Sequence, residues 1–261
     1  MSTPKTDVEW AEIISAQKDL LPEKIPAYPT QLPSRISRTI DHTRLAPSAT
    51  ESQVDTLCDE AREYGFATVC VRLGHVSRAV RNLQETPEVG VACVVGFHEG
   101  TYPTQEKVDE AQDAMNNGAS ELDMVINYPL LKKGLYTDVF GDVFAVRTAA
   151  PSPVRLKVIL ETSQLTRDEI IAGSVISCMA GADYVKTSTG FNGPGATVEN
   201  VALMRATVEL LGTGCKVKAS GGVRGAEDCV AMLRAGAHRI GASAGVKIVK
   251  ELVRDVKGIE L

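Results

Sequence analysis

From residue 35 onward, two kinds of segment alternate regularly along the chain. Short apolar or β-branched runs, typical of strands, are separated by stretches of about 10 to 16 residues whose apolar positions recur with the period of a helix. The runs lie at residues 39–42, 67–72, 90–97, 121–127, 155–161, 182–189, 216–222 and 239–243. Strands that alternate with helices pair in parallel, because a parallel pair needs a crossover of this length. The sequence therefore predicts an α/β protein with a parallel sheet.

The number of these units indicates how the sheet closes. Eight strand–helix units within about 225 residues match a (β/α)8 TIM barrel. Four of the predicted helices end in a glycine that leads into the next strand, and glycine suits the left-handed conformation just past a helix. These glycines are Gly65, Gly118, Gly181 and Gly236. A doubly wound open sheet is the alternative, but no G-x-G-x-x-G follows the first strand to support it.

Residues 1–34 differ from the repeating part. They are predicted to form an N-terminal helical extension and linker, and residues 35–261 the barrel catalytic domain. An amphipathic stretch at residues 8–21 precedes a proline-rich run, PEKIPAYPTQLPS. So few residues cannot bury a core of their own. We therefore expect four apolar side chains of the helix to pack on the barrel, namely Trp10, Ile13, Ile14 and Leu20.

Composition and charge exclude several classes of protein. A net charge of −5 at pH 7 gives no attraction to nucleic acid or to an anionic membrane surface. No apolar run reaches the roughly 18 residues of a membrane span. The six cysteines stand singly, without a C-x-x-C pair, which favours reduced core cysteines. Because the N-terminus also lacks a signal-peptide pattern, the sequence predicts a cytoplasmic protein with no nucleic-acid or membrane partner.

Two lysines stand at comparable positions on the sixth and seventh predicted strands, ADYVKTSTG and KVKASGG. Active sites of such barrels lie at the carboxyl ends of the strands. If Lys186 and Lys218 both point inward, their amines approach within about 6 Å, and a repulsion of roughly 2–3 kcal/mol lowers a lysine pKa by about two units. Burial adds to this effect and makes an amine nucleophilic near neutral pH. With Asp123 as a proton relay, the pattern predicts Schiff-base chemistry; a snorkelling or ion-paired lysine is the alternative.

Glycines at the ends of the last three strands predict a phosphate site. Glycine lets backbone N–H groups approach an anion, and a following helix adds the favourable field of its N-terminus. Phosphate sites after strands seven and eight recur in this fold. The alternative is that these glycines only form tight turns. The residues concerned are Gly190, Gly221, Gly222, Arg224, Gly241 and Ser243.

Other polar residues near the strand ends have roles that the sequence leaves open. Lys157, together with Glu161, either lines the pocket or forms a buried ion pair, and Cys70 is either reactive or part of the core. Lys216 lies one layer nearer the opposite end of the barrel, which favours a structural role. The four histidines lack the spacing of zinc ligands, so no metal is expected.

Six segments in the same order resemble the deoxyribose-phosphate aldolase family, class I aldolases on a (β/α)8 barrel. They are DHTRL, ELDMVIN, LKVILET, GADYVKTSTGF, KVKASGGVR and RIGAS, and the resemblance runs from about residue 36 to 255. It implies that Lys186 is the Schiff-base lysine, Lys218 the second lysine that perturbs it, and Asp123 the aspartate of the proton relay. Asp41 matches an acidic residue near the two lysines. The glycine-rich segments named above fall on the family's phosphate-binding loops.

The resemblance also implies a reaction: reversible cleavage of 2-deoxy-D-ribose 5-phosphate to D-glyceraldehyde 3-phosphate and acetaldehyde, in deoxyribonucleotide catabolism. The imine is the electron sink, so no cofactor is expected. Both a homodimer and a homotetramer stay open. Two positions depart from the family, since His98 stands where many members have proline and Ala244 where a second serine often follows Ser243. The alternatives are another phosphate-binding barrel aldolase or isomerase, and a non-catalytic barrel that binds sugar phosphates.

Overall fold

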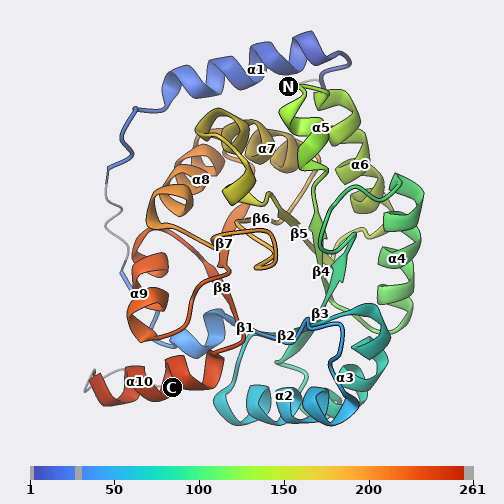
Figure 1. Cartoon of the computed structure of the whole chain (residues 1–261), viewed down its shortest axis with the longest axis vertical. Helices are drawn as coiled ribbons and strands as arrows, with labels where there is room; N and C mark the ends of the chain where they lie inside the picture. Colours follow the sequence, from blue (N-terminus) through green and yellow to red (C-terminus); the bar gives the residue numbers. More distant parts are fainter. Residues whose placement is uncertain (1–2, 27–30, 256–261) are drawn as a thin grey trace.

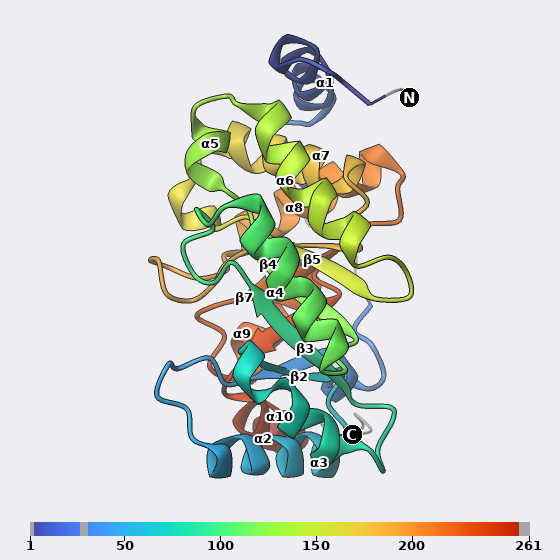
Figure 2. The same ribbon diagram turned by 90° about the vertical axis from the view of Figure 1, so that its right-hand side faces the viewer.

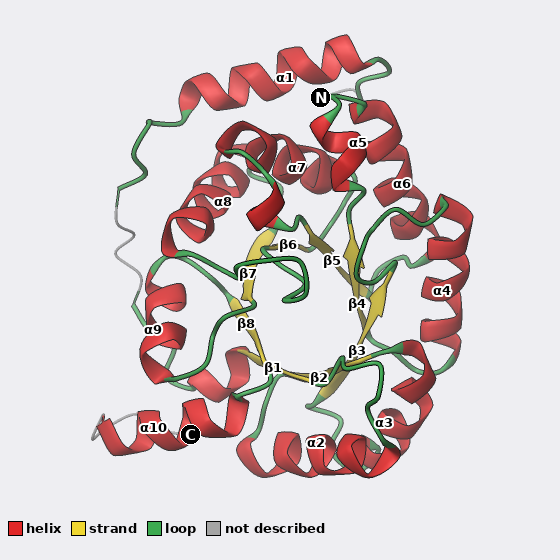
Figure 3. Ribbon diagram, in the orientation of Figure 1, coloured by secondary structure: helices red, strands yellow, loops and turns green. Residues whose placement is uncertain are grey.

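Eight parallel strands form a closed barrel in chain order, and β1 pairs with both β2 and β8. The computed structural model describes residues 3–26 and 31–255. Helices surround the strands on the outside (Figure 1, Figure 3). The (β/α)8 barrel is confirmed, and the open sheet is wrong. The strands are β1 (Ile40–Thr43), β2 (Thr68–Val71), β3 (Gly90–Val95), β4 (Glu121–Val125), β5 (Arg155–Ile159), β6 (Tyr184–Lys186), β7 (Lys216–Ser220) and β8 (Arg239–Ala242).

The helices start and stop where their end residues satisfy the free backbone groups. Thr50 and Thr166 each accept a hydrogen bond from the backbone N–H three residues ahead, in a capping box. The four predicted glycines at helix ends have φ values of 63°, 95°, 86° and 105°, as the left-handed position requires. The helices of the ring are α2 (Glu51–Tyr64), α3 (Val76–Leu83), α4 (Thr104–Asn116), α5 (Tyr128–Lys132), α6 (Tyr136–Ala149), α7 (Arg167–Met179), α8 (Val198–Leu211), α9 (Ala226–Arg234) and α10 (Gly245–Asp255).

Helix α1 (Asp7–Leu20) lies outside this ring, against α6 and α7 (Figure 1, Figure 2). Trp10 is fully buried, with its ring 5.1 Å from that of Phe140. The Asp7 carboxylate accepts the Thr137 backbone N–H at 2.8 Å. The expectation for Leu20 is wrong: its side chain is 65% exposed, because the last residue of the helix faces away from the barrel. Of the predicted domains, residues 1–2, 27–30 and 256–261 lie outside the described part.

The interior of the barrel differs from the core between barrel and helices. The outer core is apolar, whereas only a small apolar cluster lies inside, on the side of β1 to β5. It consists of Leu45, Cys70, Ala92, Val94, Phe97, Val125 and Ile159. Most of the remaining inward positions carry charged or polar side chains, among them Asp41, Asp123, Lys186 and Lys218. In residues 3–26 and 31–255, no helix is long and apolar enough to cross a membrane.

Candidate active site

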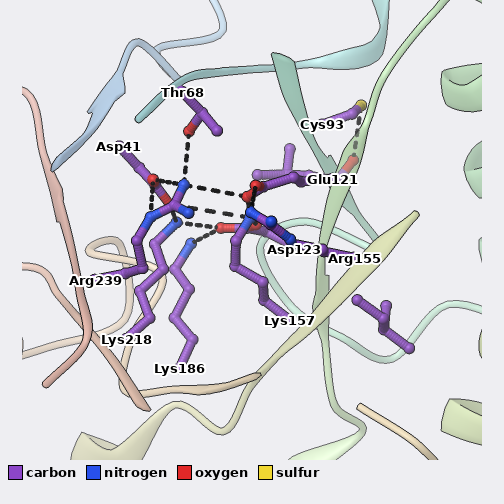
Figure 4. Close-up of polar contacts among 12 residues, drawn as sticks. Asp41, Thr68, Cys93, Glu121, Asp123, Arg155, Lys157, Lys186, Lys218 and Arg239 are labelled. Carbon is purple, nitrogen blue, oxygen red and sulfur yellow. Dashed lines mark hydrogen bonds and ion pairs between the residues drawn. The ribbon is translucent and has the colours of Figure 1, made fainter. Parts of the chain in front are cut away.

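Seven charged side chains meet inside the barrel, and none is more than 6% exposed. Alternation along each strand points them inward, and the register of neighbouring strands sets them opposite one another, Asp123 beside Lys157 and Lys186 beside Lys218. They come from β1, β4, β5, β6, β7 and β8 (Figure 4). The seven are Asp41, Glu121, Asp123, Lys157, Lys186, Lys218 and Arg239.

Asp123 is the centre of this cluster. One of its oxygens, Oδ2, accepts hydrogen bonds from Lys186 Nζ at 2.7 Å and from Lys218 Nζ at 2.6 Å. The other, Oδ1, accepts one from Lys157 Nζ at 2.5 Å. Because the two lysines contact the same oxygen, their amines are close neighbours, as the strand pattern predicts.

Two further carboxylates contact Lys157, Lys218 and Arg239. Asp41 lies 2.5 Å from Lys218 Nζ and accepts the Arg239 Nε–H at 2.7 Å. Glu121 lies 2.7 Å from Lys157 Nζ and 3.2 Å from Arg239. Lys157 is therefore part of a buried ion-pair network with Glu121 and Asp123, the second of the two roles that the sequence left open.

Counting charges in this network sets Lys186 apart. Three carboxylates face four cations, and burial of an unbalanced charge is costly. Burial alone would raise the carboxyl pKa values of Asp41, Glu121 and Asp123, but the neighbouring cations outweigh burial and hold all three below their usual range. The network is neutral when one of the four cations gives up its proton.

The pKa directions identify that cation. Burial lowers the pKa of Lys157, Lys218 and Arg239, but the adjacent carboxylates outweigh it and raise all three. The pKa of Lys186 is lowered instead. Burial is the largest cause, the charge of Lys218 lowers the pKa further, and Asp123 opposes both. The strand pattern predicts repulsion from Lys218 as the main cause, but in the structure burial contributes more. Lys186 is thus the lysine of this network most readily available as a neutral amine.

The apolar cluster forms a wall beside the lysines. Cys70 belongs to it and is fully buried. Burial raises the pKa of its thiol to about 11, so the thiol stays protonated at neutral pH. Core packing is therefore the better interpretation of Cys70. All six cysteines of the chain are free and buried.

The β6–α8 connection crosses the mouth of the barrel (Figure 1) and rests on the glycine pair after β7. The Ala196 backbone N–H donates to the carbonyls of Ser220 and Gly221, at 3.1 and 3.0 Å. A Cβ on Gly195 would lie 2.0 Å from the Gly221 carbonyl carbon. A Cβ on Gly190 would lie 3.8 Å from the Gly221 Cα. The structure thus brings Gly190 and Gly221–Gly222 together, and it adds Gly195, whose need for glycine is visible only once the two loops touch.

The other predicted phosphate residues lie differently. Gly241 is within β8, where a Cβ would come within 3.0 Å of Lys218 Cε. Arg224 is exposed, and its backbone N–H donates to Asp228 at 2.8 Å. Ser243 is exposed and lines a separate cavity of about 580 Å³ with His42 and Glu60. Gly241 thus lies beside Ser220, which directly precedes the glycine pair of β7, whereas Arg224 and Ser243 have other contacts.

Glu161 has a role that the sequence did not predict, fixing the segment after Lys186. It has φ 60° and is 1% exposed. Its carboxylate accepts the Thr189 backbone N–H at 3.3 Å, the Thr189 hydroxyl and the Asn192 amide at 3.3 Å. The same amide donates to the His98 carbonyl at 3.0 Å. A carboxylate directly after a strand is the sequence signal, but its partners belong to a loop whose path the sequence does not give.

The loop after β3 contains the departure from the family's proline. The His98 ring stacks on Phe191 at 5.0 Å, and Phe97 meets Phe191 edge to face at 5.2 Å. Phe191 follows Gly190 in the β6–α8 connection. An aromatic contact, worth about 0.5–1.5 kcal/mol, therefore joins the two loops at the position where His98 replaces proline.

Comparison with known proteins agrees with this geometry. A model of the DeoC/LacD family of aldolases matches residues 36–252. The deoxyribose-phosphate aldolase of Coccidioides immitis (strain RS) is 64% identical over 245 residues, which cover 93% of this chain and 91% of that protein. A crystal structure assigned as that aldolase from Coccidioides immitis aligns with a TM-score of 0.93 and 62% identity, over 97% of this chain and 100% of the other. A tetrameric deoxyribose phosphate aldolase from Aeropyrum pernix aligns with a TM-score of 0.77 and 32% identity, over 94% of this chain and 98% of the other.

Proposed function

The chain belongs to the DeoC/LacD family of aldolases, and from that premise we propose that it cleaves 2-deoxy-D-ribose 5-phosphate to D-glyceraldehyde 3-phosphate and acetaldehyde, reversibly, through an imine on Lys186. The observation that carries the proposal is the charge count inside the barrel. Of the four cations in the network inside the barrel, Lys186 is the one whose pKa is lowered, while the pKa values of Lys157, Lys218 and Arg239 are raised. A neutral buried amine is the nucleophile that a class I aldolase requires.

The reaction follows from this placement. Lys186 Nζ adds to the C1 carbonyl of the open-chain sugar, and loss of water gives the iminium. As the C3 hydroxyl loses its proton, the C2–C3 bond breaks, its electrons flow into the iminium and D-glyceraldehyde 3-phosphate leaves. The enamine takes a proton at C2, and water hydrolyses the imine to acetaldehyde and free lysine. Asp123, 2.7 Å from Lys186 Nζ, stays ionised and orients the water that moves the protons.

Lys218 acts on Lys186 through its charge, and Asp41 acts on Lys186 through Lys218. Lys218 stays an ammonium because Asp41 and Asp123 both contact it, so its charge disfavours a second ammonium at Lys186. Asp41 in turn binds Arg239 and fixes the position of Lys218. These are positioning roles for Asp41 and an electrostatic role for Lys218.

We assign the substrate's phosphate to the glycine loops above β6, β7 and β8. Gly221 and Gly222 have φ values of 79° and 77°, and Gly190 has 85°, a conformation that lets successive N–H groups converge on an anion. The exposed Arg224 adds positive field. Gly241 and Ser243 complete the site from β8. The phosphorylated sugar is then the only small-molecule partner that the chemistry needs, with neither cofactor nor metal.

We also propose a cytoplasmic homo-oligomer, a dimer or a tetramer. Six reduced, buried cysteines suit a reducing compartment, and the aligned protein from Aeropyrum pernix is described as tetrameric. Light scattering of the purified chain distinguishes the two assemblies, and a monomer at micromolar concentration would contradict both.

A coupled assay tests the proposed reaction. Release of D-glyceraldehyde 3-phosphate from 2-deoxy-D-ribose 5-phosphate is followed by a dehydrogenase, with acetaldehyde measured in parallel. We expect equal amounts of both products, unchanged by EDTA, and no release by Lys186→Arg. An isomerase would give neither product, and a silent binding protein no turnover. Loss of activity in EDTA that zinc restores would contradict the imine mechanism.

A further inference from the structure

A second polar cavity, of about 460 Å³, lies at the opposite end of the barrel from the phosphate loops. Its walls include the first residues of four consecutive strands, Arg155, Tyr184, Lys216 and Arg239, and also Arg38 from the 3-10 turn (Ile36–Thr39) before β1. All four strand residues have inward parity, so they form the lowest layer of the barrel interior. Among the described residues that line this cavity, none is an aspartate or a glutamate.

The cations here are only partly neutralised. Lys216 is exposed and has no ion-pair partner among residues 3–26 and 31–255. The Arg38 guanidinium donates to the Glu88 carbonyl at 3.1 Å. Arg155 is 55% exposed and contacts one oxygen of Glu121 at 3.0 Å. A concave surface lined by positive charges concentrates anions near it. The cavity therefore favours an anion.

The donors present suit a tetrahedral dianion. Arginine offers paired N–H groups that match phosphate oxygens, and Lys216 adds a point charge. The Tyr184 hydroxyl makes no hydrogen bond within the described chain and supplies a further donor. His238 also lines the cavity, but burial lowers its pKa to about 4, so it adds no charge at neutral pH.

We propose that this cavity binds a phosphate or phosphomonoester dianion, at a site separate from the one that holds the phosphate of the substrate. The proposal does not depend on the proposed reaction. It depends on the cavity, on the cations that line it and on the absence of a carboxylate from its described lining.

Arg239 links this site to the lysines. It lines the cavity and also binds Asp41 and Glu121, which hold Lys218 and Lys157. A bound dianion competes for Arg239 and adds negative charge below the network. The groups that influence Lys186 are Asp123 on β4, Lys218 on β7, Cys70 on β2 and Glu161 after β5. Because the dianion offsets part of the positive charge of Arg239, the ammonium form of Lys186 is favoured. Imine formation then slows at neutral pH.

Calorimetry with inorganic phosphate tests the site on the full chain. We compare the unchanged protein with Lys216→Glu and Arg38→Glu, and with Lys133→Glu as a charge-matched control at an exposed lysine on another face. Lys216→Glu and Arg38→Glu should each weaken one phosphate site at least about tenfold. Gly222→Val should leave that site intact and affect the other. Identical isotherms for Lys216→Glu, Arg38→Glu and Lys133→Glu would overturn the proposal.

The link to the lysines has its own readout. The rate of borohydride trapping with acetaldehyde is measured at neutral pH with and without phosphate. Phosphate should slow trapping in the unchanged protein and in Lys133→Glu, but not in Lys216→Glu. If phosphate binds at the lower cavity and the trapping rate does not change, the link through Arg239 is wrong. Glucose 6-phosphate in place of phosphate tells whether the site takes phosphomonoesters as well as free phosphate.

Discussion

Inside the barrel, Lys186 is distinguished from Lys157 and Lys218 by the number of carboxylates beside it. Lys157 is within 2.7 Å of Glu121 and 2.5 Å of Asp123, and Lys218 within 2.6 Å of both its carboxylates. In the described part of the chain, Lys186 pairs with Asp123 alone, at an oxygen that it shares with Lys218. A difference of one carboxylate at this depth decides which lysine carries a proton.

Removing the charge of Lys218 should therefore change the pH dependence of imine formation. In Lys218→Leu, the Asp123 oxygen that contacts Lys186 is no longer shared with Lys218, and the pKa of Lys186 rises. Free amine then forms at higher pH, so the rise in trapping rate should move upward by about one to two pH units. Trapping with acetaldehyde and borohydride across a pH series measures this shift.

Lys133→Leu is the control, because Lys133 is an exposed lysine outside both the charged network and the lining of the lower cavity. In phosphate-free buffer its profile should coincide with that of the unchanged protein. A profile for Lys218→Leu that stays in place, or moves to lower pH, would contradict the electrostatic role of Lys218.

At the scale of elements, the β6–α8 connection joins both halves of the site. It begins directly after Lys186, is held by Glu161 through Thr189 and Asn192, and rests on Gly221. Movement of this connection would disturb the nucleophile and the phosphate loops together. Because the connection lies on top of the glycine pair, the backbones of Gly195 and Gly221 come too close for a Cβ on Gly195.

Gly222→Val tests the phosphate assignment. The glycine has φ 77°, and a Cβ there would meet its first neighbour only at 3.9 Å, so the side chain would occupy space that an anion needs. We expect KM for 2-deoxy-D-ribose 5-phosphate to rise at least about tenfold, and KM for unphosphorylated deoxyribose to change little. Steady-state kinetics with both sugars give the comparison.

Gly212→Val separates backbone strain from loss of phosphate binding. Gly212 has φ 62° and nothing within 4 Å, but it ends α8 at the far end of the barrel. This variant should lower stability without changing either KM. Equal effects of Gly222→Val on both sugars would place the phosphate elsewhere.

Much of the element pattern could be predicted from sequence, since each strand–helix unit carries its own periodicity and its own terminal glycine. Each of the eight predicted runs overlaps one of the eight strands of the barrel. The close approach of Lys186 and Lys218 follows from adjacent strands with equal parity. The role of Lys157 could not be predicted, because its contact with Asp123 depends on the register between β4 and β5. The loop contacts of Glu161 and His98 depend on chain paths for which the sequence carries no periodic signal.

For the whole molecule, the charged interior makes folding depend on pH. The folded pKa values of Asp41, Glu121 and Asp123 lie below the usual values of 3.8 and 4.5. Their contribution to the free energy of unfolding is therefore complete above about pH 5 and is lost as pH falls, because the unfolded chain binds protons that the folded chain does not. Loss of this contribution lowers the free energy of unfolding of the barrel.

We expect the urea midpoint of unfolding to fall slightly between about pH 7 and 5.5, because burial lowers the pKa values of His42 and His238 in the folded chain. It should fall steeply between about pH 5 and 3, with a loss of several kcal/mol. Circular dichroism follows the transition at each pH. A midpoint that stays unchanged down to about pH 3 would show that the three carboxyl groups titrate alike in the folded and unfolded chain, against the ion-pair network described above.

If Lys186 is the reacting amine, the substrate carbon becomes bonded to its Nζ, and this bond can be located. The protein is incubated with acetaldehyde near neutral pH, reduced with borohydride, digested and analysed by peptide mass. We predict one ethyl adduct, on Lys186, and none on that peptide in Lys186→Arg, because a guanidinium is not a nucleophile at this pH. An adduct on Lys218 or Lys157 would contradict the assignment even if the chain cleaves the sugar as proposed.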